Sequence, residues 1–380
     1  MTSSTKRILF YSLLLVFLLL SPLLIAKSVG YSIDFTHARL ERKGGVFIKS
    51  KMSRISIFLD GAFVRETSFF SGGALLTNVD PGTHLMRLEK AHFRPWSKTV
   101  LVEPMTATTF RNVLLIPNPI ISSTSTPFEF KLIAKTKENE LRVRNDAHAS
   151  SASPKSSSRF RIDKNKNLLT ASGTSTLVVA SNVELFKEID GMAYFIDKNG
   201  FLARLNQSDF SIQTIGRPGF YLNSKGVEFI NSEHGNLFIL DSGSGLYMLD
   251  SFDAALKTIT GGVTSIAFDE RYTKLIIKRE QSADVMWLED NTDQPFQKKG
   301  TRKSLIATNV PIRDAVWYFG DNAHVVVHTR DGVFLTEIDD RGGTNTVTLI
   351  SGNVDEIRTT PEAPTKIFYL KGKVWYTIEI

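Results

Sequence analysis

The sequence contains no cysteine among its 380 residues. This absence excludes disulfide bonds, so each folded domain must be held together by its own hydrophobic core. Histidine is scarce as well, with seven copies. Because few side chains of the kind that bind zinc are present, we expect no metal site.

The short motifs of several large enzyme classes are also missing. The chain has no Gly-x-Ser-x-Gly, P-loop or Gly-x-Gly-x-x-Gly pattern. These are the motifs that expose a nucleophilic serine or hold a phosphate group. We therefore predict that the protein is not an enzyme, with no catalytic residues and no cofactor.

Long runs of one charge are absent too. The 46 basic and 39 acidic side chains give a net charge of +7, and no five or more like charges follow one another. A scattered excess of this size is typical of a solvated surface, although it could also attract an anionic polymer, phospholipid headgroups or nucleic acid. We favour the solvated surface and expect no nucleic-acid partner.

One long uncharged stretch is present near the N-terminus. Residues 8–26 carry no charged side chain, and Lys6 and Arg7 precede them. As a helix they would span about 28 Å, close to the roughly 30 Å hydrocarbon core of a bilayer. We predict a cytoplasmic tail and single-pass anchor in residues 1–28, with the following domains outside the cell membrane. The alternative is a cleaved secretory signal.

The next segment, residues 40–117, has the pattern of short strands joined by sharp turns. In residues 54–59 the apolar Ile55, Ile57 and Leu59 fall on one side of a strand, and Asp60-Gly61 follows directly. This pair is a strong hairpin signal because glycine accepts a positive φ. The pattern predicts a small β-sandwich, with Trp96 and Phe93 packed at the edge of its core.

This stretch resembles the PEGA domain, a small β-sandwich of prokaryotic surface proteins. The matching segments are residues 45–50, 57–61, 81–90 and 93–96. His92 stands where the family usually has glycine, and the next residue is phenylalanine instead of tyrosine. The resemblance implies a non-catalytic envelope module placed between an anchor and a larger domain.

Two polar segments follow the sandwich. Residues 118–127 begin and end near prolines, which is consistent with a short linker. Residues 145–158 are rich in serine and predict a surface loop. We expect this loop to belong to a second domain that covers residues 128–380.

That second domain repeats a unit of apolar strands and tight turns. The copies cover residues 183–205, 227–249, 263–288, 312–338 and 354–380. They start about 36 to 49 residues apart, and periods near 40 to 50 indicate the blades of a β-propeller. The last copy stops after its third strand, so its fourth strand should come from the beginning of the domain and close the ring. We expect about six blades.

The repeats resemble the WD40-like and TolB-like propellers of bacterial envelopes. Residues 266–270 occupy the same position in the repeat as the Phe-Ser-Pro-Asp-Gly turn of that group, but they lack its proline and glycine. The resemblance implies the fold rather than a particular activity, because propellers serve many unrelated roles.

Few side chains remain as candidates for chemistry. His324 and His328 have the spacing of a helical zinc site, but their segment reads as a strand, which would place the rings about 13 Å apart. Asp339 and Asp340 fit a turn better than a catalytic pair. The best electrostatic candidate is a basic rim for interaction, made of Arg271, Lys274, Lys278, Lys298, Lys299, Arg302 and Lys303.

The sequence as a whole predicts an all-β, membrane-anchored binding or scaffolding protein of the prokaryotic cell envelope. Its propeller would bind an envelope protein or a polysaccharide. Two alternatives stay open. One is a propeller enzyme that acts on envelope glycans, which would need convergent carboxylates. The other is the ectodomain of a signalling complex.

Overall fold

The computed structural model describes residues 3–28, 31–34, 39–126, 129, 131, 159–172, 175–189, 192–206, 208–215, 227–231, 236–249 and 256–380. Within these residues the secondary structure is one helix, α1 (Ser3–Ser28), and 32 β-strands. The chain is therefore predominantly β, as predicted. The polar loop expected at residues 145–158 lies outside the described residues.

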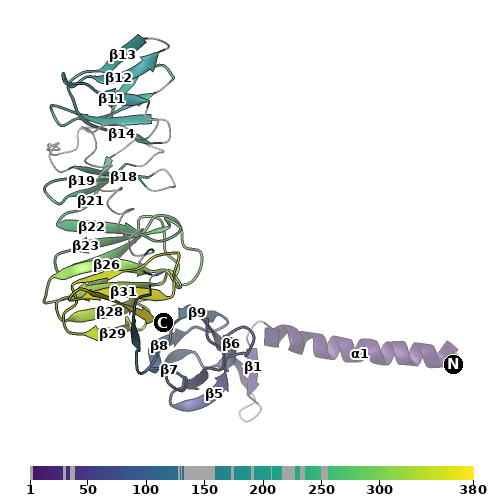
Figure 1. Ribbon diagram of the computed structural model, residues 1–380. Helices are drawn as coiled ribbons and strands as arrows, with labels where there is room; N and C mark the ends of the chain where they lie inside the picture. Colours follow the sequence, from purple (N-terminus) through teal and green to yellow (C-terminus); the bar gives the residue numbers. More distant parts are fainter. Residues whose placement is uncertain are drawn as a thin grey trace.

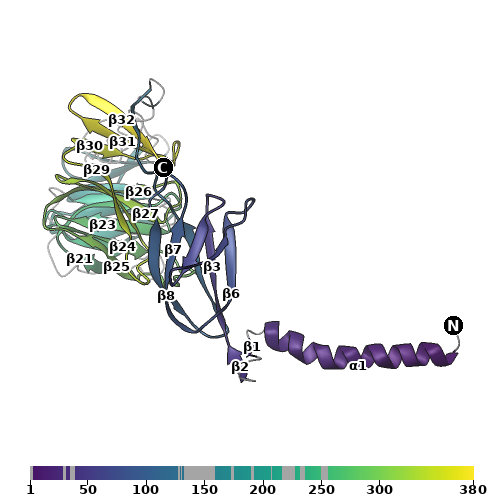
Figure 2. The same ribbon diagram turned by 90° about the horizontal axis from the view of Figure 1, so that it is seen from below.

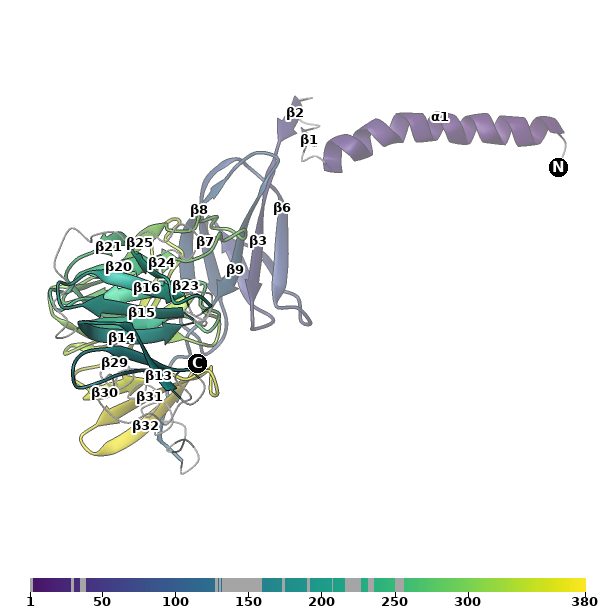
Figure 3. The same ribbon diagram turned by 90° about the horizontal axis from the view of Figure 1, so that it is seen from above.

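Helix α1 extends away from the β-structure in every view (Figures 1 and 3). In the described part of the chain, no helix is both long enough and apolar enough to cross a bilayer. The prediction of a single-pass anchor, with the following domains held outside the cell membrane, is therefore wrong.

After α1, two short strands, β1 (Tyr31–Asp34) and β2 (Arg39–Arg42), pair with each other. The chain then forms two sheets that face each other, with strand orders β6-β3-β9 and β5-β4-β7-β8. Their strands are β3 (Gly44–Ser50), β4 (Ser56–Leu59), β5 (Ala62–Glu66), β6 (Gly73–Val79), β7 (Gly82–Glu89), β8 (Trp96–Val102) and β9 (Ala107–Val113). Figure 2 shows this sandwich beside the remaining sheets.

Side chains from both sheets of the sandwich share one core. Ile48 and Ile57 are fully buried on facing sheets, and Trp96 belongs to the same cluster with Phe93 packed against it. The predicted hairpin is present, because Asp60 and Gly61 join β4 to β5 with positive φ values of 51° and 83°. The sequence pattern therefore located both the turn and the edge of the core correctly.

The rest of the chain forms six sheets that follow one another in a column (Figure 1). Four of them contain four antiparallel strands in chain order. Their strands are β14 (Val183–Ile189), β15 (Met192–Asp197), β16 (Leu202–Asn206), β17 (Ile212–Thr214), β18 (Glu228–Asn231), β19 (Leu237–Leu240), β20 (Leu246–Leu249), β21 (Leu256–Thr260), β22 (Val263–Phe268), β23 (Lys274–Arg279), β24 (Ser282–Trp287), β25 (Arg302–Ala307), β26 (Ile312–Tyr318), β27 (His324–Thr329), β28 (Gly332–Glu337) and β29 (Thr346–Ser351). This is the strand arrangement of propeller blades.

The two end sheets differ from these four. The first contains β11 (Phe160–Ile162), β12 (Leu168–Ser172) and β13 (Ser175–Ala180). The last contains β30 (Glu356–Arg358), β31 (Lys366–Lys371) and β32 (Val374–Glu379), and β10 (Ser122–Thr124) pairs with β32. An early strand therefore completes the last sheet, as predicted, but it comes from the segment 118–127 that we interpreted as a linker.

The same hydrogen bond recurs at three of the five junctions between neighbouring sheets. The amide of Val183 donates to Lys166, that of Val263 to Ser244 and that of Ile312 to Glu280, in each case to the carbonyl oxygen. Ser244 and Glu280 lie in the turn between the second and third strands of their sheets, and Lys166 lies in the turn between β11 and β12. By this equivalence β11, β12 and β13 are the second to fourth strands of the first sheet.

Hydrophobic packing follows the same order. Five core clusters each join two neighbouring sheets. Within the described residues no cluster joins the first sheet to the last, and Figure 1 shows β11, β12 and β13 at the top of the column and β31 in its lower part. The described sheets therefore form a row with five shared interfaces, and the expected closed ring is not seen in them.

Candidate functional site

The sandwich lies against the fourth and fifth sheets of the row, and a cavity of about 460 Å³ remains between them. We call it the junction cavity. Its walls come from β8 and β9 of the sandwich, from the turns 269–273 and 319–323, from the long connection 288–301, and from the end of β28 with the residues that follow it. The sandwich and the fourth and fifth sheets, which are far apart in sequence, thus form the junction cavity together.

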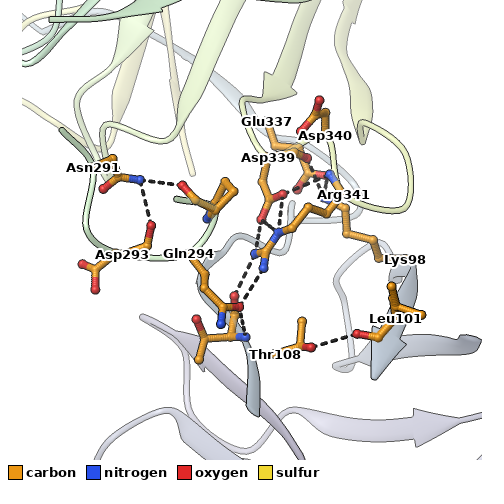
Figure 4. A network of polar contacts seen from close by, with 12 residues as sticks. Lys98, Leu101, Thr108, Asn291, Asp293, Gln294, Glu337, Asp339, Asp340 and Arg341 are labelled. Atoms are coloured by element: carbon orange, nitrogen blue, oxygen red, sulfur yellow. Dashed lines mark hydrogen bonds and ion pairs between the residues drawn. The ribbon is translucent and has the colours of Figure 1, made fainter. Parts of the chain in front are cut away.

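A buried ion pair fixes the position of the sandwich at this junction (Figure 4). The ammonium group of Lys98 on β8 contacts the carboxylate of Glu337 on β28, and the two side chains are 1% and 7% exposed. Lys98 also donates to the carbonyl oxygen of Asp339 at 2.6 Å. Asn345 donates to Glu337 from both its amide and its side chain at 2.9 Å. The buried carboxylate therefore has several donors, as a desolvated charge requires.

A second polar contact holds the edge of the sandwich. Strand β9 is an edge strand, and Gln294 of the long connection bonds to its backbone like a neighbouring strand. Its Oε1 accepts from the amide of Thr109 at 2.8 Å, and its Nε2 donates to the carbonyl oxygen of Ala107 at 3.1 Å. Gln294 thereby satisfies backbone groups that an edge strand leaves open.

Arg341 ties these parts together. Its guanidinium group donates to Asp339 at 2.9 Å, to Gln294 Oε1 at 3.0 Å and to the carbonyl oxygen of Thr109 at 2.8 Å. It also lies 4.5 Å from the ring centre of Phe110. Burial works to raise the pKa of Asp339, but the hydrogen bond from Arg341 and nearby positive charges outweigh it and lower the pKa. The junction is therefore a charged network held in one arrangement.

The deep part of the cavity wall contains a histidine–aspartate pair. Nδ1 of His324 lies 2.7 Å from Oδ2 of Asp321, and both side chains are buried. Burial works to lower the pKa of His324, but the charge of Asp321 and its hydrogen bond outweigh it and raise the pKa. Beside them, Asp269 accepts from Lys274 at 2.9 Å and from the hydroxyl of Thr273 at 2.8 Å. These carboxylates thus hold the turns that form the wall.

His324 and His328 both lie on β27, so the prediction of a strand is confirmed. Nε2 of His328 donates to the carbonyl oxygen of Val354 at 3.1 Å, and burial lowers the pKa of His328. In the portion of the chain that the structure covers, no three histidine or carboxylate side chains are placed to hold a metal ion.

The seven residues of the predicted basic rim do not form one surface. Arg271 and Lys274 line the junction cavity. Lys278 is buried, donates to the carbonyl oxygen of Ile312 at 3.1 Å, and has a pKa that burial lowers. Lys298 pairs with Asp290 at 2.8 Å on the exposed long connection.

The other three rim residues are also separated. Lys299 donates its backbone amide to Asp290 at 2.8 Å. Arg302 and Lys303 are adjacent on β25, where successive side chains point to opposite faces. Arg302 reaches the carbonyl oxygen of Ile259 in the third sheet, and Lys303 reaches Asp340 in the fifth, at 3.0 and 2.7 Å. The residues of the predicted rim thus contact different partners in different parts of the row.

Sequence reasoning missed most of the junction. The sequence pattern predicts only core packing for Trp96. It predicts no role for Phe110, Gln294, Asp321 or Arg341. The one available signal was Lys98, a charged residue at an inward position of a strand that otherwise alternates regularly. A lysine placed there requires a buried acidic partner, although the sequence does not say which.

No family model matches the chain, and no curated protein does. Solved structures similar to parts of it include YCF48 from Cyanidioschyzon merolae, at 11% identity over 58% of this chain and 76% of that chain, with a TM-score of 0.31. Hsv2 from Kluyveromyces lactis is 11% identical over 55% and 68%, with a TM-score of 0.33. The Cps50 (Swd1) β-propeller domain of Myceliophteria thermophila is 12% identical over 52% and 64%, with a TM-score of 0.31. At these TM-scores the assignment of blade-like sheets rests on the strand order of this chain itself, and the PEGA and TolB-like resemblances stay predictions.

Proposed function

We propose that the protein is a non-catalytic binding protein, in which the row of sheets and the attached sandwich form one rigid platform for a protein partner. The observation that carries this proposal is the junction. Lys98, Glu337, Gln294 and Arg341 fix the two units against each other, and a cavity stays between them. A preformed concave surface between two fixed units is a common place for ligands to bind.

The state of the carboxylates at the cavity supports binding over catalysis. A general acid that protonates a leaving group at neutral pH needs a raised pKa. At this cavity, the pKa of Asp339 is lowered, and the hydrogen bond from Lys298 lowers that of Asp290. Glu337, Asp269 and Asp321 are occupied by internal donors. These groups stabilise the junction rather than present a free acid and base.

A glycan-cleaving enzyme is the second candidate, because carboxylates from two neighbouring sheets do meet at this cavity. It predicts that purified protein releases reducing ends from an envelope polysaccharide, and that Glu289→Gln or Asp293→Asn abolishes the release. We expect no release by the unmodified protein. The ectodomain alternative depended on the membrane anchor and is not carried further.

Site-specific cross-linking tests the binding proposal. Because the chain has no cysteine, one cysteine can be introduced and labelled with a photoreactive benzophenone. Asp293→Cys places the label at the junction cavity, and Arg161→Cys places it on the exposed face of β11 as a matched control. We expect a discrete protein adduct in cells of the same source from position 293 and none from position 161.

Each alternative result has a clear meaning. Absence of any adduct at position 293 would contradict the proposal. An adduct that is removed by glycosidases instead of proteases would change the partner from a protein to a polysaccharide.

A further inference from the structure

The volume and the lining of the junction cavity indicate which kind of partner it binds. This inference rests on the proposed binding function. The cavity volume of about 460 Å³ lies within the range of ligand pockets, roughly 300–1,000 Å³. That space accommodates one or two side chains of an extended segment, rather than a folded domain.

The charges on the wall favour a cationic guest. Seven carboxylate residues line the cavity, against three lysine and arginine residues. Several of these carboxylates are matched by internal cations, such as Asp269 by Lys274 and Asp339 by Arg341. An anionic guest would still face more carboxylates than cations, so the wall disfavours it.

Two carboxylates on the long connection are available to a guest. Glu289 is exposed and lines the cavity, and it makes no ion pair or hydrogen bond within the described part of the chain. Asp293 faces Arg111 of β9 at 3.6 Å, with side chains 62% and 51% exposed. An exposed ion pair of this length contributes little and is readily exchanged for a better partner.

A third acceptor lies deeper in the same wall. Oδ1 of Asn322 is buried and has no hydrogen-bond partner. Its Nδ2 donates to Glu270 at 3.2 Å, so turning the amide over would bring its oxygen against a carboxylate. An unsatisfied buried acceptor is unfavourable, and a donor from a guest that reaches this atom would satisfy it.

The aromatic part of the wall also suits a cation. Trp96, Phe110 and Trp287 line the cavity. Two of these rings already lie beside internal cations, with Lys98 5.8 Å from Trp96 and Arg341 4.5 Å from Phe110. Ammonium and guanidinium groups donate hydrogen bonds without accepting them, and they bind to aromatic faces.

We infer that the junction cavity binds a basic segment of a protein partner, whose arginine or lysine side chain donates to Asn322 Oδ1 and pairs with Glu289 and Asp293. The cavity then serves as the recognition pocket of the platform. The sandwich contributes Trp96 and Phe110 to the aromatic wall, and the fourth and fifth sheets contribute Trp287 and the acceptors.

Fluorescence anisotropy with a labelled peptide of alternating arginine and glycine tests this inference on the full chain. The matched probe replaces each arginine by citrulline, which keeps the shape and removes the charge. We expect the arginine peptide to bind and the citrulline peptide to bind at least about tenfold more weakly. The double variant Glu289→Gln/Asp293→Asn should weaken arginine binding by about tenfold, and Asn322→Ala by several-fold.

Asp209→Asn is the control variant, because it removes one carboxylate charge from an exposed turn of the second sheet. It should leave binding unchanged, and circular dichroism should show all variants folded. Equal binding of the two peptides, no binding at ~1 mM peptide, or an unchanged affinity of the double variant would overturn the inference. If the adduct at position 293 forms while the peptide fails, the binding function stands and only the basic partner is wrong.

Discussion

Lys98 and Glu337 form a buried ion pair although 239 residues separate them in the sequence. The pair joins the sandwich to the fifth sheet, and removing one partner leaves an uncompensated buried charge. We expect Lys98→Met to lower the free energy of unfolding by about 3–5 kcal/mol. Urea denaturation measures the change.

The double variant Lys98→Met/Glu337→Leu should recover much of this loss, because it removes both buried charges. The matched control is Lys43→Met, which breaks the pair with the exposed Asp80 and should cost about 1 kcal/mol or less. A cost for Lys98→Met as small as that of the control would show that the junction does not depend on the pair.

The sequence pattern predicted the inner strands of the sheets well. Residues 263–268 were expected as a strand and form β22, and the predicted strand at 324–328 differs from β27 by one residue. Strand β27 is buried along its whole length, and its centre reads as an apolar run, whereas β22 is only partly buried. The outer strands were missed, because β21 and β25 are half exposed and show no clear alternation.

The sequence predicted the residues of the junction much less well than it predicted the inner strands. The basic rim relied on cations that are close in the chain, yet folding pairs Lys303 with Asp340 and Lys298 with Asp290. The junction depends on contacts between the sandwich and the fifth sheet, and no local period records them. Strand β10 was hidden for the same reason, since three polar residues form a strand only when β32 lies beside them.

Gly342 should be intolerant of any side chain. It has a φ of +64°, and an added Cβ would lie 1.7 Å from the carbonyl oxygen of Thr99 on β8. Gly343, with a φ of +103°, has open space at the same position. Both alanine variants bear the cost of a left-handed backbone, about 1–2 kcal/mol. Gly342→Ala should cost about 1–3 kcal/mol more because β8 must move.

Thermal or urea unfolding of the two glycine variants measures this difference. Equal stabilities would mean that the loop after β28 does not pack against β8 as closely as the structure shows.

Trp317 tests the packing between neighbouring sheets. It is 1% exposed in the fifth sheet, and its Nε1 donates to the carbonyl oxygen of Ala267 in the fourth at 3.0 Å. Trp317→Phe should lower the free energy of unfolding by about 2–3 kcal/mol, because it removes the bond and part of the contact. The same change at the partly exposed Trp375 of β32 should cost about 1 kcal/mol or less. Similar costs at both positions would argue against the fourth-to-fifth interface.

His324 and His328 should make the free energy of unfolding depend on pH in opposite directions. The pKa of His324 is raised in the folded state, so its contribution is complete below about pH 6.5 and is lost as the pH rises through the folded-state pKa. The pKa of His328 is lowered, so its contribution is complete above about pH 6.5 and is lost as the pH falls. His324→Gln should flatten the stability profile on the alkaline side of about pH 6.5, and His328→Gln on the acid side.

Urea denaturation between about pH 5 and 9 measures both profiles. Asp321→Asn provides the decisive comparison, because it keeps the ring of His324 and removes the charge that raises its pKa. It should flatten the same side of the profile as His324→Gln. If it instead left the alkaline slope intact, the pair between Asp321 and His324 would not be the source of the pH dependence, and the wall of the junction cavity would be held by other contacts.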